Sequence, residues 1–390
     1  MIQTLVDALV VASGALFALI GLAAVLRLRS LPELEPLDEP PRGRVCAVVP
    51  YRDAAAEIGP TIEALAAQQQ VSMAIVAVDD RSTDGGGEVL RALDLPNLRL
   101  RRVDQLPAGW LGKCHACRIG AAACDEADWL LFVDSDSRLD ADLVARAVRV
   151  AERQGAGHLC LIPDLDGQTF WGRSVSLTMS LGLVLQAGRL EDDRQGAYMG
   201  VGAFNLVRRD LYLRIGGHER LRMEVLDDIG LARLLRLAGA RSRIRFAPRW
   251  FRVTWITTLR SAITVTEKNY FAMRHFAVLP FAAGCGVVAL SWAAVLGAPV
   301  VATPLAAGLA LTGLGAMTLA TLPIATRYGW SRALLLGVPF VVPVIVVAML
   351  NSMIRTLRQG GIAWRGTFYP LPALRAGDVR RRAQSSSLFS

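Results

Sequence analysis

The sequence predicts a mostly parallel α/β sheet domain with Rossmann-like winding, joined to transmembrane helices at both ends. Three observations lead to this prediction. Between residues 45 and 246, short apolar runs alternate with segments of helical period, as in parallel sheets that are covered on both faces. One long uncharged stretch precedes this region, and two more follow it. Each is long enough to cross a hydrocarbon core of about 30 Å as a helix.

The N-terminal apolar segment, Ala8 to Leu26, predicts a membrane anchor rather than a cleaved signal peptide. The residues before it carry no positive charge, and no cleavage site of small residues follows it. Arg27 and Arg29 come next, and by the positive-inside rule they place the following domain in the cytoplasm. We therefore expect an N-terminal anchor over 1–28, a Pro-rich linker over 29–44, and a multi-pass protein of the cell (inner) membrane.

The C-terminal part is dominated by apolar sequence without charge, from Phe276 to Thr326 and from Ala333 to Ile354. It predicts about three transmembrane helices over 276–354, with an interfacial helix region at 251–275 before them and a basic tail at 355–390 after them. An odd number of spans would put that tail outside, whereas the positive-inside rule prefers it inside. A re-entrant last segment, bent at Pro339 and Pro343, would remove this conflict, as would an earlier segment that does not cross.

The net charge of +9 includes a dense basic group, Arg380 to Arg382. A basic face on an anionic membrane explains this charge more simply than nucleic acid does, because no basic stripe is interleaved with stacking aromatics. We therefore expect no nucleic-acid partner.

Six cysteines in a cytoplasmic domain are expected to be reduced. Cys114 and Cys117 have the spacing of a metal ligand pair. A structural zinc site needs a second such pair, and none is present. We interpret these residues as packing thiols.

The expected strands and helices follow one another regularly along the central region. In such sheets, ligands bind at the carboxyl ends of the strands. Strands are predicted at 45–49, 73–78, 98–103, 129–133 and 158–162, and helices at 57–70, 86–93, 113–124 and 140–153.

Carboxylates follow two of these strands. Asp79 and Asp80 end the second strand, and Asp134 and Asp136 follow the fourth. Two aspartates separated by one residue can share Mg²⁺ or Mn²⁺, while phosphate oxygens take the other positions around the ion. Asp79 or Asp80 could hydrogen-bond a base or ribose.

A third carboxylate pair, Asp227 and Asp228, opens a later helical segment. The helix dipole favours acidic residues at this position. One residue is enough for that purpose, so the second is a candidate general base.

These motifs together resemble glycosyltransferase family 2, whose members have the GT-A fold. VVPYRDAAAEIGPTIEALAAQ is similar to the opening strand and helix of the family, AVDDRSTD to its nucleotide motif, LLFVDSDSR to its metal motif and VLDDIGLARLL to its acceptor-base motif. Three further segments look most like the hopene-associated and carotenoid-modifying members, with ceramide glucosyltransferases as more distant relatives: QLPAGWLGKCHA, GAFNLVRRDLYLRIGGHE and IAWRGTFYPL. The resemblance implies a GT-A domain over residues 45–250.

The resemblance assigns roles to individual residues. Asp228 would be the catalytic base with Asp227 beside it, and Asp134 and Asp136 would bind the metal and the diphosphate. Contacts to the rest of the nucleotide sugar are implied for Asp53, Asp79, Asp80, Lys113, and Gly202 and Ala203 of the GAFN turn.

The implied activity is inverting, metal-dependent transfer of a hexose from a nucleotide sugar to a lipid acceptor. From the family, the donor is expected to be UDP-linked. Hopanoids, carotenoids and other hydroxylated or carboxylated lipids fit that acceptor class. Polyprenyl phosphate and diacylglycerol are alternative acceptors. An alternative of another class is a catalytically inactive membrane scaffold or lipid transporter.

The sequence lacks the QxxRW motif of processive members, which argues against a polysaccharide synthase. Its absence leaves open which groups stabilise the leaving diphosphate besides the metal. Candidates to replace it are Trp255, Arg260, Glu267 and Lys268.

Overall fold

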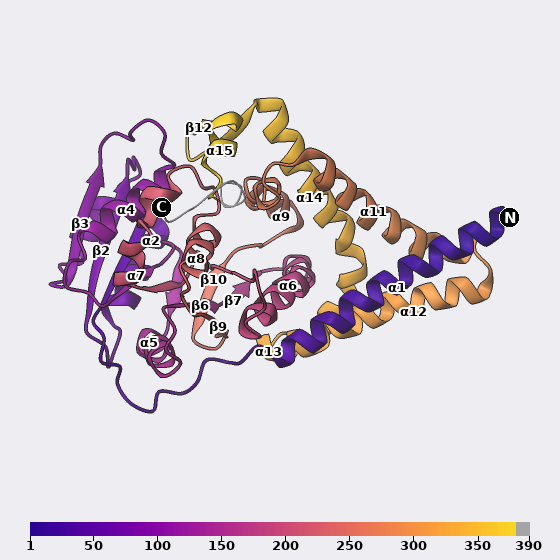
Figure 1. The fold of residues 1–390 in the computed structure, drawn as a ribbon, viewed down its shortest axis with the longest axis horizontal. Coiled ribbons are helices and arrows are strands. Elements are labelled where there is room, and N and C mark those ends of the chain that lie inside the picture. Colours follow the sequence, from indigo (N-terminus) through magenta and orange to yellow (C-terminus); the bar gives the residue numbers. More distant parts are fainter. Residues whose placement is uncertain (380–390) are drawn as a thin grey trace. The chain divides into compact units, whose positions relative to one another are not determined.

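The computed structural model describes residues 1–379, so the basic group Arg380 to Arg382 lies outside the described residues. The chain forms two compact units (Figure 1). An α/β unit contains Pro32–Asp164, Asp193–Thr254 and the described residues from Gly360 onward. A helical unit contains Met1–Leu31, Leu165–Asp192 and Trp255–Gln359.

The α/β unit is built on a seven-stranded sheet of order β3-β2-β1-β4-β8-β6-β9. β8 is antiparallel to both of its neighbours, and the pairings β3-β2, β2-β1, β1-β4 and β6-β9 are parallel. The expectation of a mostly parallel α/β sheet is confirmed. The strands are β1 (Val45–Tyr51), β2 (Met73–Asp80), β3 (Leu98–Val103), β4 (Trp129–Phe132), β6 (His158–Ile162), β8 (Asn205–Arg208) and β9 (Ser242–Phe246).

Helices cover both faces of this sheet. Every residue of β1 is buried, and its side chains alternate between two cores, Val45 and Ala47 in one and Cys46 and Val48 in the other. Residues of α2 and α5 complete the first core, and residues of α4 and α8 complete the second. The helices of this unit are α2 (Ala55–Ala66), α3 (Gly86–Arg91), α4 (Gly112–Ala122), α5 (Leu143–Arg153), α7 (Arg209–Arg214), the 3-10 helix η1 (Gly217–Leu221) and α8 (Asp227–Leu237).

Several short elements extend the unit at its margins. β5 (Ser137–Leu139) pairs antiparallel with β10 (Phe251–Thr254), and the chain leaves the unit at β7 (Asp164–Asp166). A hairpin of β11 (Gly361–Trp364) and β12 (Thr367–Pro370) is followed by α15 (Leu371–Gly377). This hairpin belongs to the α/β unit although about 100 residues of the helical unit precede it in the sequence.

The cysteines differ from expectation in one respect. Cys46 of β1 and Cys124, just after α4, form a disulfide across a Cα–Cα distance of 5.8 Å. The expectation that all six are reduced is therefore wrong for this pair. The packing of α4 on β1 brings the two residues together, and their separation of 78 positions hides this proximity in the sequence. Cys114, Cys117, Cys160 and Cys285 are buried and form no disulfide. For Cys114 and Cys117 this agrees with packing thiols.

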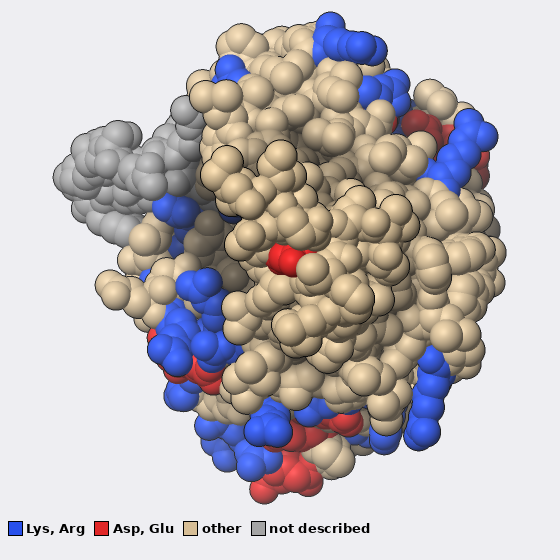
Figure 2. All heavy atoms as spheres, turned by 90° about the vertical axis from the view of Figure 1, so that its right-hand side faces the viewer, with Lys and Arg blue, Asp and Glu red and all other residues tan. Residues whose placement is uncertain are grey.

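The helical unit holds four helical segments long and apolar enough to cross a membrane within the described residues: Ile2–Arg29, Val278–Val301, Pro304–Tyr328 and Arg332–Gln359. Figure 2 shows a face made almost entirely of uncharged side chains, with charged ones gathered near its margins. Large apolar residues such as Leu279, Val300 and Leu305 are exposed. The elements are α1 (Ile2–Arg29), α6 (Phe170–Glu191), α9 (Leu259–Val265), α10 (Asn269–Met273), α11 (Val278–Val301), α12 (Pro304–Ala320), α13 (Leu322–Tyr328), the 3-10 helix η2 (Arg332–Gly337) and α14 (Val338–Gln359).

Helices α1 and α12 lie side by side in the same direction (Figure 1). At the start of α1, Asp7 accepts hydrogen bonds from the backbone and hydroxyl of Thr303, both at 2.9 Å. Further along, Gly14 lies against Gly313, and a Cβ built on Gly313 would be 2.1 Å from the carbonyl oxygen of Gly14. Glycines at such positions let the two backbones approach closely, as is common in membrane helix pairs.

Candidate active site

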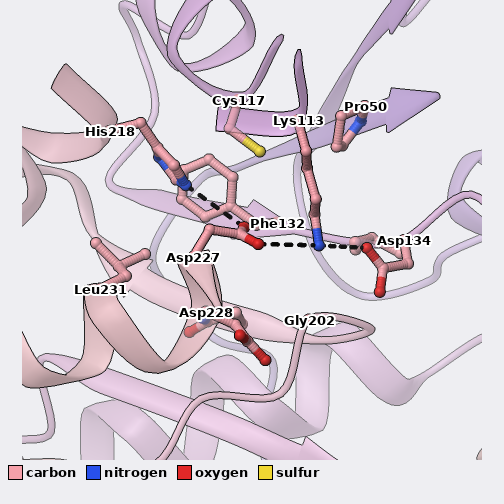
Figure 3. Close-up of a pocket in the computed structure, with 12 residues that line it drawn as sticks. Pro50, Lys113, Cys117, Phe132, Asp134, Gly202, His218, Asp227, Asp228 and Leu231 are labelled. Atoms are coloured by element: carbon pink, nitrogen blue, oxygen red, sulfur yellow. Dashed lines mark ion pairs between the residues drawn. The ribbon is translucent and has the colours of Figure 1, made fainter. Parts of the chain in front are cut away.

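A small pocket opens at the carboxyl ends of β1 and β4 and is closed on the other side by the start of α8 (Figure 3). Its lining residues come from segments far apart in the sequence. Among them are five that the sequence predicts as site residues: Lys113, Asp134, Gly202, Asp227 and Asp228.

Lys113 is placed between two of the predicted carboxylates. Its Nζ lies 2.8 Å from Oδ1 of Asp134 and 3.4 Å from Oδ1 of Asp227 (Figure 3). Burial alone disfavours the charged ammonium. Asp134 and then Asp227 outweigh that effect and raise the pKa of Lys113 well above its ordinary value. Lys113 is therefore a fixed positive charge in the pocket.

Because Gly202 has no side chain, it leaves room for the charged groups of Asp134, Lys113 and Asp228 to approach one another. A Cβ at this residue would lie 3.0 Å from Oδ2 of Asp134, 3.2 Å from Nζ of Lys113 and 3.6 Å from Oδ2 of Asp228. The GAFN turn thus brings bare backbone to the centre of the charged cluster, where a ligand can approach closely. Ala203, the next residue, is buried in the core, and its carbonyl accepts a hydrogen bond from Ser137.

Asp227 and Asp228 are the first two residues of α8. Asp227 is buried and Asp228 is half-buried. Burial, and next the negative charge of Asp227, raise the pKa of Asp228. A carboxylate with a raised pKa is a better proton acceptor near neutral pH than an ordinary aspartate.

A tyrosine and a histidine stand behind Asp227. The hydroxyl of Tyr212 accepts a hydrogen bond from the backbone N–H of His218 at 3.1 Å, and it lies 3.0 Å from Nδ1 of the same residue. The carboxylate of Asp227 can only accept, and its Oδ2 lies 3.8 Å from Nε2 of His218. We therefore assign the ring proton to Nε2, which leaves Nδ1 to accept from the hydroxyl of Tyr212. Burial lowers the pKa of His218, so the ring is neutral. This series of contacts, from Tyr212 through His218, orients the carboxylate of Asp227.

Cys117, His218 and Asp227 could by themselves suggest a metal site, since a ligand atom of each lies within 4.8 Å of the other two. The ammonium of Lys113 already faces Asp227 at 3.4 Å, and Nε2 of His218 carries its proton toward the same residue. Both features oppose a second cation. We interpret the group as support for Asp227.

Asp134 and Asp136 supply the oxygen ligands that Mg²⁺ and Mn²⁺ prefer. Burial and the neighbouring Asp134 raise the pKa of Asp136 to about 6. Two carboxylates that disfavour each other's charge in this way fit a divalent cation, which would relieve the repulsion. Asp136 is half-buried and lies beside the pocket rather than among its lining residues.

The carboxylates of the other three predicted aspartates form hydrogen bonds with residues in and near the loops after β1 and β2. Oδ1 of Asp53 accepts hydrogen bonds from the backbone N–H and hydroxyl of Thr83, which ties the two loops together. Asp79 is bound by Ser82 and Arg102, and Asp80 pairs through both oxygens with Arg81. These carboxylates shape the loops and are not free in the structure.

The start of α4 connects these loops with the pocket. A Cβ at Gly112 would lie 2.0 Å from Oδ2 of Asp80, while the next residue, Lys113, reaches Asp134. The carboxylates after β2 and β4 are therefore parts of one continuous surface at the carboxyl edge of the sheet.

Sequence reasoning assigns no role to Tyr212 and His218. Both lie in the segment GAFNLVRRDLYLRIGGHE, which carries part of the family resemblance without a role for either residue. Asn205 is expected at the pocket as the last residue of the GAFN turn, and it is among the lining residues. Asn205 starts the antiparallel strand β8 and binds His158 of β6 at 2.6 Å. The only signal for that strand is the four-residue run NLVR, which is too short to recognise alone.

Comparison with known proteins relates part of the α/β unit to a family. Residues 46–216 match the model of Glycosyl transferase family 2. No curated protein was found to match the sequence. This part of the chain is therefore similar to glycosyltransferase family 2, which agrees with the family-level part of the resemblance. The hopene-associated and carotenoid-modifying subgroup stays a prediction.

Solved structures resemble the chain at low sequence identity. Mannosyltransferase PcManGT from Pyrobaculum calidifontis, solved with GDP-Man and Mn²⁺, is 19% identical with a TM-score of 0.57, over 91% of this chain and 99% of that one. S. aureus TarS 1-349 with UDP-GlcNAc is 13% identical with a TM-score of 0.39, over 83% and 95%. Mannosyl-3-phosphoglycerate synthase from Rubrobacter xylanophilus is 16% identical with a TM-score of 0.42, over 64% and 82%. The first likeness shows that the chain has the fold of that transferase.

Proposed function

We propose that the chain is a glycosyltransferase of family 2 and that it transfers a sugar, with inversion, from a nucleotide-sugar donor to the hydroxyl or carboxyl group of a membrane lipid. The observation that carries the proposal is the meeting of Asp134, Lys113 and Asp228 around the bare backbone of Gly202. Acidic metal ligands, a cation and a general base are thereby gathered at one point of the sheet edge.

Inverting transfer needs a base on the acceptor side and positive charge on the leaving-group side. Asp228 takes the proton of the acceptor hydroxyl as its oxygen bonds to the anomeric carbon. The bond from that carbon to the diphosphate breaks in the same step. A general base typically contributes 10²- to 10⁴-fold, or roughly 3–5 kcal/mol. Tyr212, His218 and Asp227 hold the start of α8 in place for this role.

The leaving diphosphate acquires negative charge as its bond breaks. A divalent cation held by Asp134 and Asp136 would supply compensating charge, worth several kcal/mol. The ammonium of Lys113 stands at the same place, 2.8 Å from Asp134. These groups answer part of the question left by the missing QxxRW motif.

A lipid acceptor is supported by the apolar helices of the chain. The described residues include four helical segments long and apolar enough to span a membrane, before and after the α/β unit in the sequence. An enzyme anchored in this way meets its acceptor at the bilayer surface. Polyprenyl phosphate and diacylglycerol fit the same geometry, so analysis of the lipid product separates them from a hopanoid or carotenoid acceptor.

The first test is binding of UDP and GDP to the purified full chain in detergent, with and without Mn²⁺. We expect Mn²⁺-dependent binding of a nucleoside diphosphate, UDP by preference, that Asp136→Asn weakens at least about tenfold, since one of two carboxylate ligands is lost. Asp125→Asn, which removes an exposed carboxylate of the same unit, is the matched control and should bind as the parent does. An absence of nucleotide binding under every condition would favour the alternative of a catalytically inactive membrane scaffold or lipid transporter.

A further inference from the structure

The C-terminal hairpin β11–β12 lies against the loops that the sequence resemblance assigns to the nucleotide. Oγ1 of Thr367 accepts hydrogen bonds from Arg52, in the loop after β1, at 3.2 Å and from Arg81, in the loop after β2, at 3.5 Å. The hydroxyl of Tyr369 accepts the backbone N–H of Gly112, the first residue of α4, at 3.2 Å. The hairpin thus contacts three separate segments at the carboxyl edge of the sheet. It lies outside the residues matched by the family model, which end at 216.

The tip of the hairpin is a two-residue turn, Arg365-Gly366, with positive φ at both residues (49° and 72°). Such turns favour asparagine or aspartate followed by glycine, and arginine in this conformation costs about 1 kcal/mol or more. Asp53 (φ 47°) and Arg81 (φ 63°) also have left-handed backbone. Strained residues of this kind gather at ligand sites, where the side chain is needed in a fixed place.

The side chains around the tip carry an excess of positive charge. Arg365 donates through Nη1 to the backbone carbonyl of Asp53 at 3.2 Å. Its guanidinium has further N–H groups that can donate at the same time. At the tip three guanidiniums, those of Arg52, Arg81 and Arg365, face two carboxylates, those of Asp53 and Asp80. Beyond them, Arg102 is paired with both Asp79 and Asp104. An anionic ligand rich in acceptor oxygens suits this surface.

The order of the strands decides which part of a nucleotide would reach the hairpin. β1 lies between β4, which is followed by the metal-ligand candidate Asp134, and β2, which ends at Asp80. Strands are spaced by about 4.8 Å, so the ends of β4 and β2 are about 10 Å apart. A nucleotide whose diphosphate lies at Asp134 therefore extends its nucleoside across β1 toward Asp80 and the hairpin.

We infer that the β11–β12 hairpin forms one wall of the donor site and that Arg365 binds the nucleoside end of the nucleotide, donating to acceptor oxygens of the base or ribose. The inference rests on the proposed function and adds to it a binding residue more than 140 positions beyond the end of the matched family domain. It makes the chain after the last apolar helix part of the catalytic unit.

The test measures binding of UDP, GDP and inorganic pyrophosphate to the full chain with Mn²⁺. We expect Arg365→Ala to weaken nucleoside diphosphate binding about tenfold or more, because a charged donor is lost. Pyrophosphate binding should change less than twofold, since pyrophosphate lacks the nucleoside. Arg365→Lys should restore part of the affinity. Arg101→Ala removes an exposed arginine of β3 and should leave all three affinities unchanged.

The outcomes separate this inference from the proposed function. If the parent protein binds no nucleotide, the proposed function fails. If the parent binds UDP or GDP and Arg365→Ala binds it equally well, only the role of the hairpin fails. An equal loss of pyrophosphate and nucleotide affinity would overturn the assignment of Arg365 to the nucleoside end. Circular dichroism and thermal melting of each variant show whether it is folded, and Arg365→Lys decides the question if the alanine variant is not.

Discussion

Asp228 shows how position and environment make an ordinary side chain a candidate catalyst. The half-buried residue starts α8, has its pKa raised by burial and Asp227, and points toward Asp134 and Lys113 across Gly202. Asp227, in contrast, is engaged by Lys113 and His218. We therefore propose different roles for the two neighbours, with Asp228 acting on the substrate and Asp227 positioning the charged groups around it.

We predict that Asp228→Asn lowers the transfer rate at least about a hundredfold while nucleotide binding stays within about twofold of the parent. An amide cannot take the acceptor proton, but it leaves the groups around Asp134 in place. Single-turnover transfer of label from donor to extracted lipid, beside a nucleotide-binding titration, measures both quantities. Full transfer activity in this variant would refute Asp228 as the base.

His158 gives a prediction about stability at low pH. It is fully buried on β6, donates to Asn205, and burial lowers its pKa to about 4 from an unfolded value of about 6.5. Between these two pKa values the unfolded chain binds more protons, so stability falls as the pH drops. This residue alone should cost about 2 kcal/mol between pH 7 and pH 5.

The measurement is the melting temperature of nucleotide-free protein at both pH values, for the parent and for His158→Gln. We expect the drop from pH 7 to pH 5 to be smaller in the variant by about 4–8 °C, because about 1 kcal/mol shifts the melting of a 150–250-residue unit by about 2–4 °C. His218, which titrates in the same direction, is present in both proteins and cancels. Equal drops would mean that His158 titrates alike in the folded and unfolded states.

At the scale of elements, α14 is the helix whose role the sequence leaves open. The chain enters the α/β unit after Leu31, at the end of α1, and again after Gln359, at the end of α14. A folded polar unit lies on one side of a bilayer, so both of these helix ends are on that side. Arg327, at the end of α13, donates to the carbonyl of Leu31 at 2.6 Å. The segment from Tyr328 to Gln359 therefore begins and ends on the same side.

Contacts of α14 agree with a re-entrant path. The carbonyl of Pro339 accepts the indole N–H of Trp292 at 2.7 Å, in the middle of α11. Near its other end, Ser352 accepts the backbone N–H of Phe271, which precedes α11. α14 thus runs from the level of Trp292, in the middle of α11, back toward the membrane surface at which α11 begins. We therefore predict three crossings, by α1, α11 and the α12–α13 pair, which would leave the residues after α14 on the side of Arg27 and Arg29.

Labelling of single cysteines in sealed, right-side-out vesicles tests this path. An impermeant maleimide should label Val300→Cys, in the exposed last turn of α11, from outside. Arg332→Cys and Arg358→Cys, before and at the end of α14, should both be protected until the vesicles are opened. Opposite results for these two positions would mean that α14 crosses. The four free native cysteines are buried and serve as the background.

For the whole molecule, the sequence predicts those parts of the structure that depend on local pattern. The apolar runs of β1, β2 and β4 predict a parallel sheet, and the rule that ligands bind at strand ends selects Asp134 and its neighbours. Lys113 and Gly202, predicted from resemblance, lie with Asp134, Asp227 and Asp228 in one pocket. For these features, the hydrophobic periodicity and the order of the segments along the chain are sufficient for the prediction.

Features that depend on contacts between distant segments could not be predicted. The run NLVR of β8 is too short to show that it inserts antiparallel between β4 and β6. The disulfide of Cys46 and Cys124 depends on how α4 packs on β1. In the sequence the β11–β12 hairpin looks like part of a basic tail, because its partners Arg52 and Arg81 precede Thr367 by 315 and 286 residues. In each case tertiary packing, rather than local preference, determines the structure.

The pairing of α1 with α12 has a consequence for biosynthesis. The two helices match along their length, Asp7 with Thr303, Gly14 with Ala310, and Leu31 with Arg327. Ribosomes add about 5–20 residues per second, so α1 waits roughly 15–60 s for a partner that is still unmade. During that interval the strands β1 to β10 are synthesised. Helices α6 and α11, which precede α12, can pack on α1 in the meantime. The glycine-lined face of α1 is therefore covered only after most of the chain has been made.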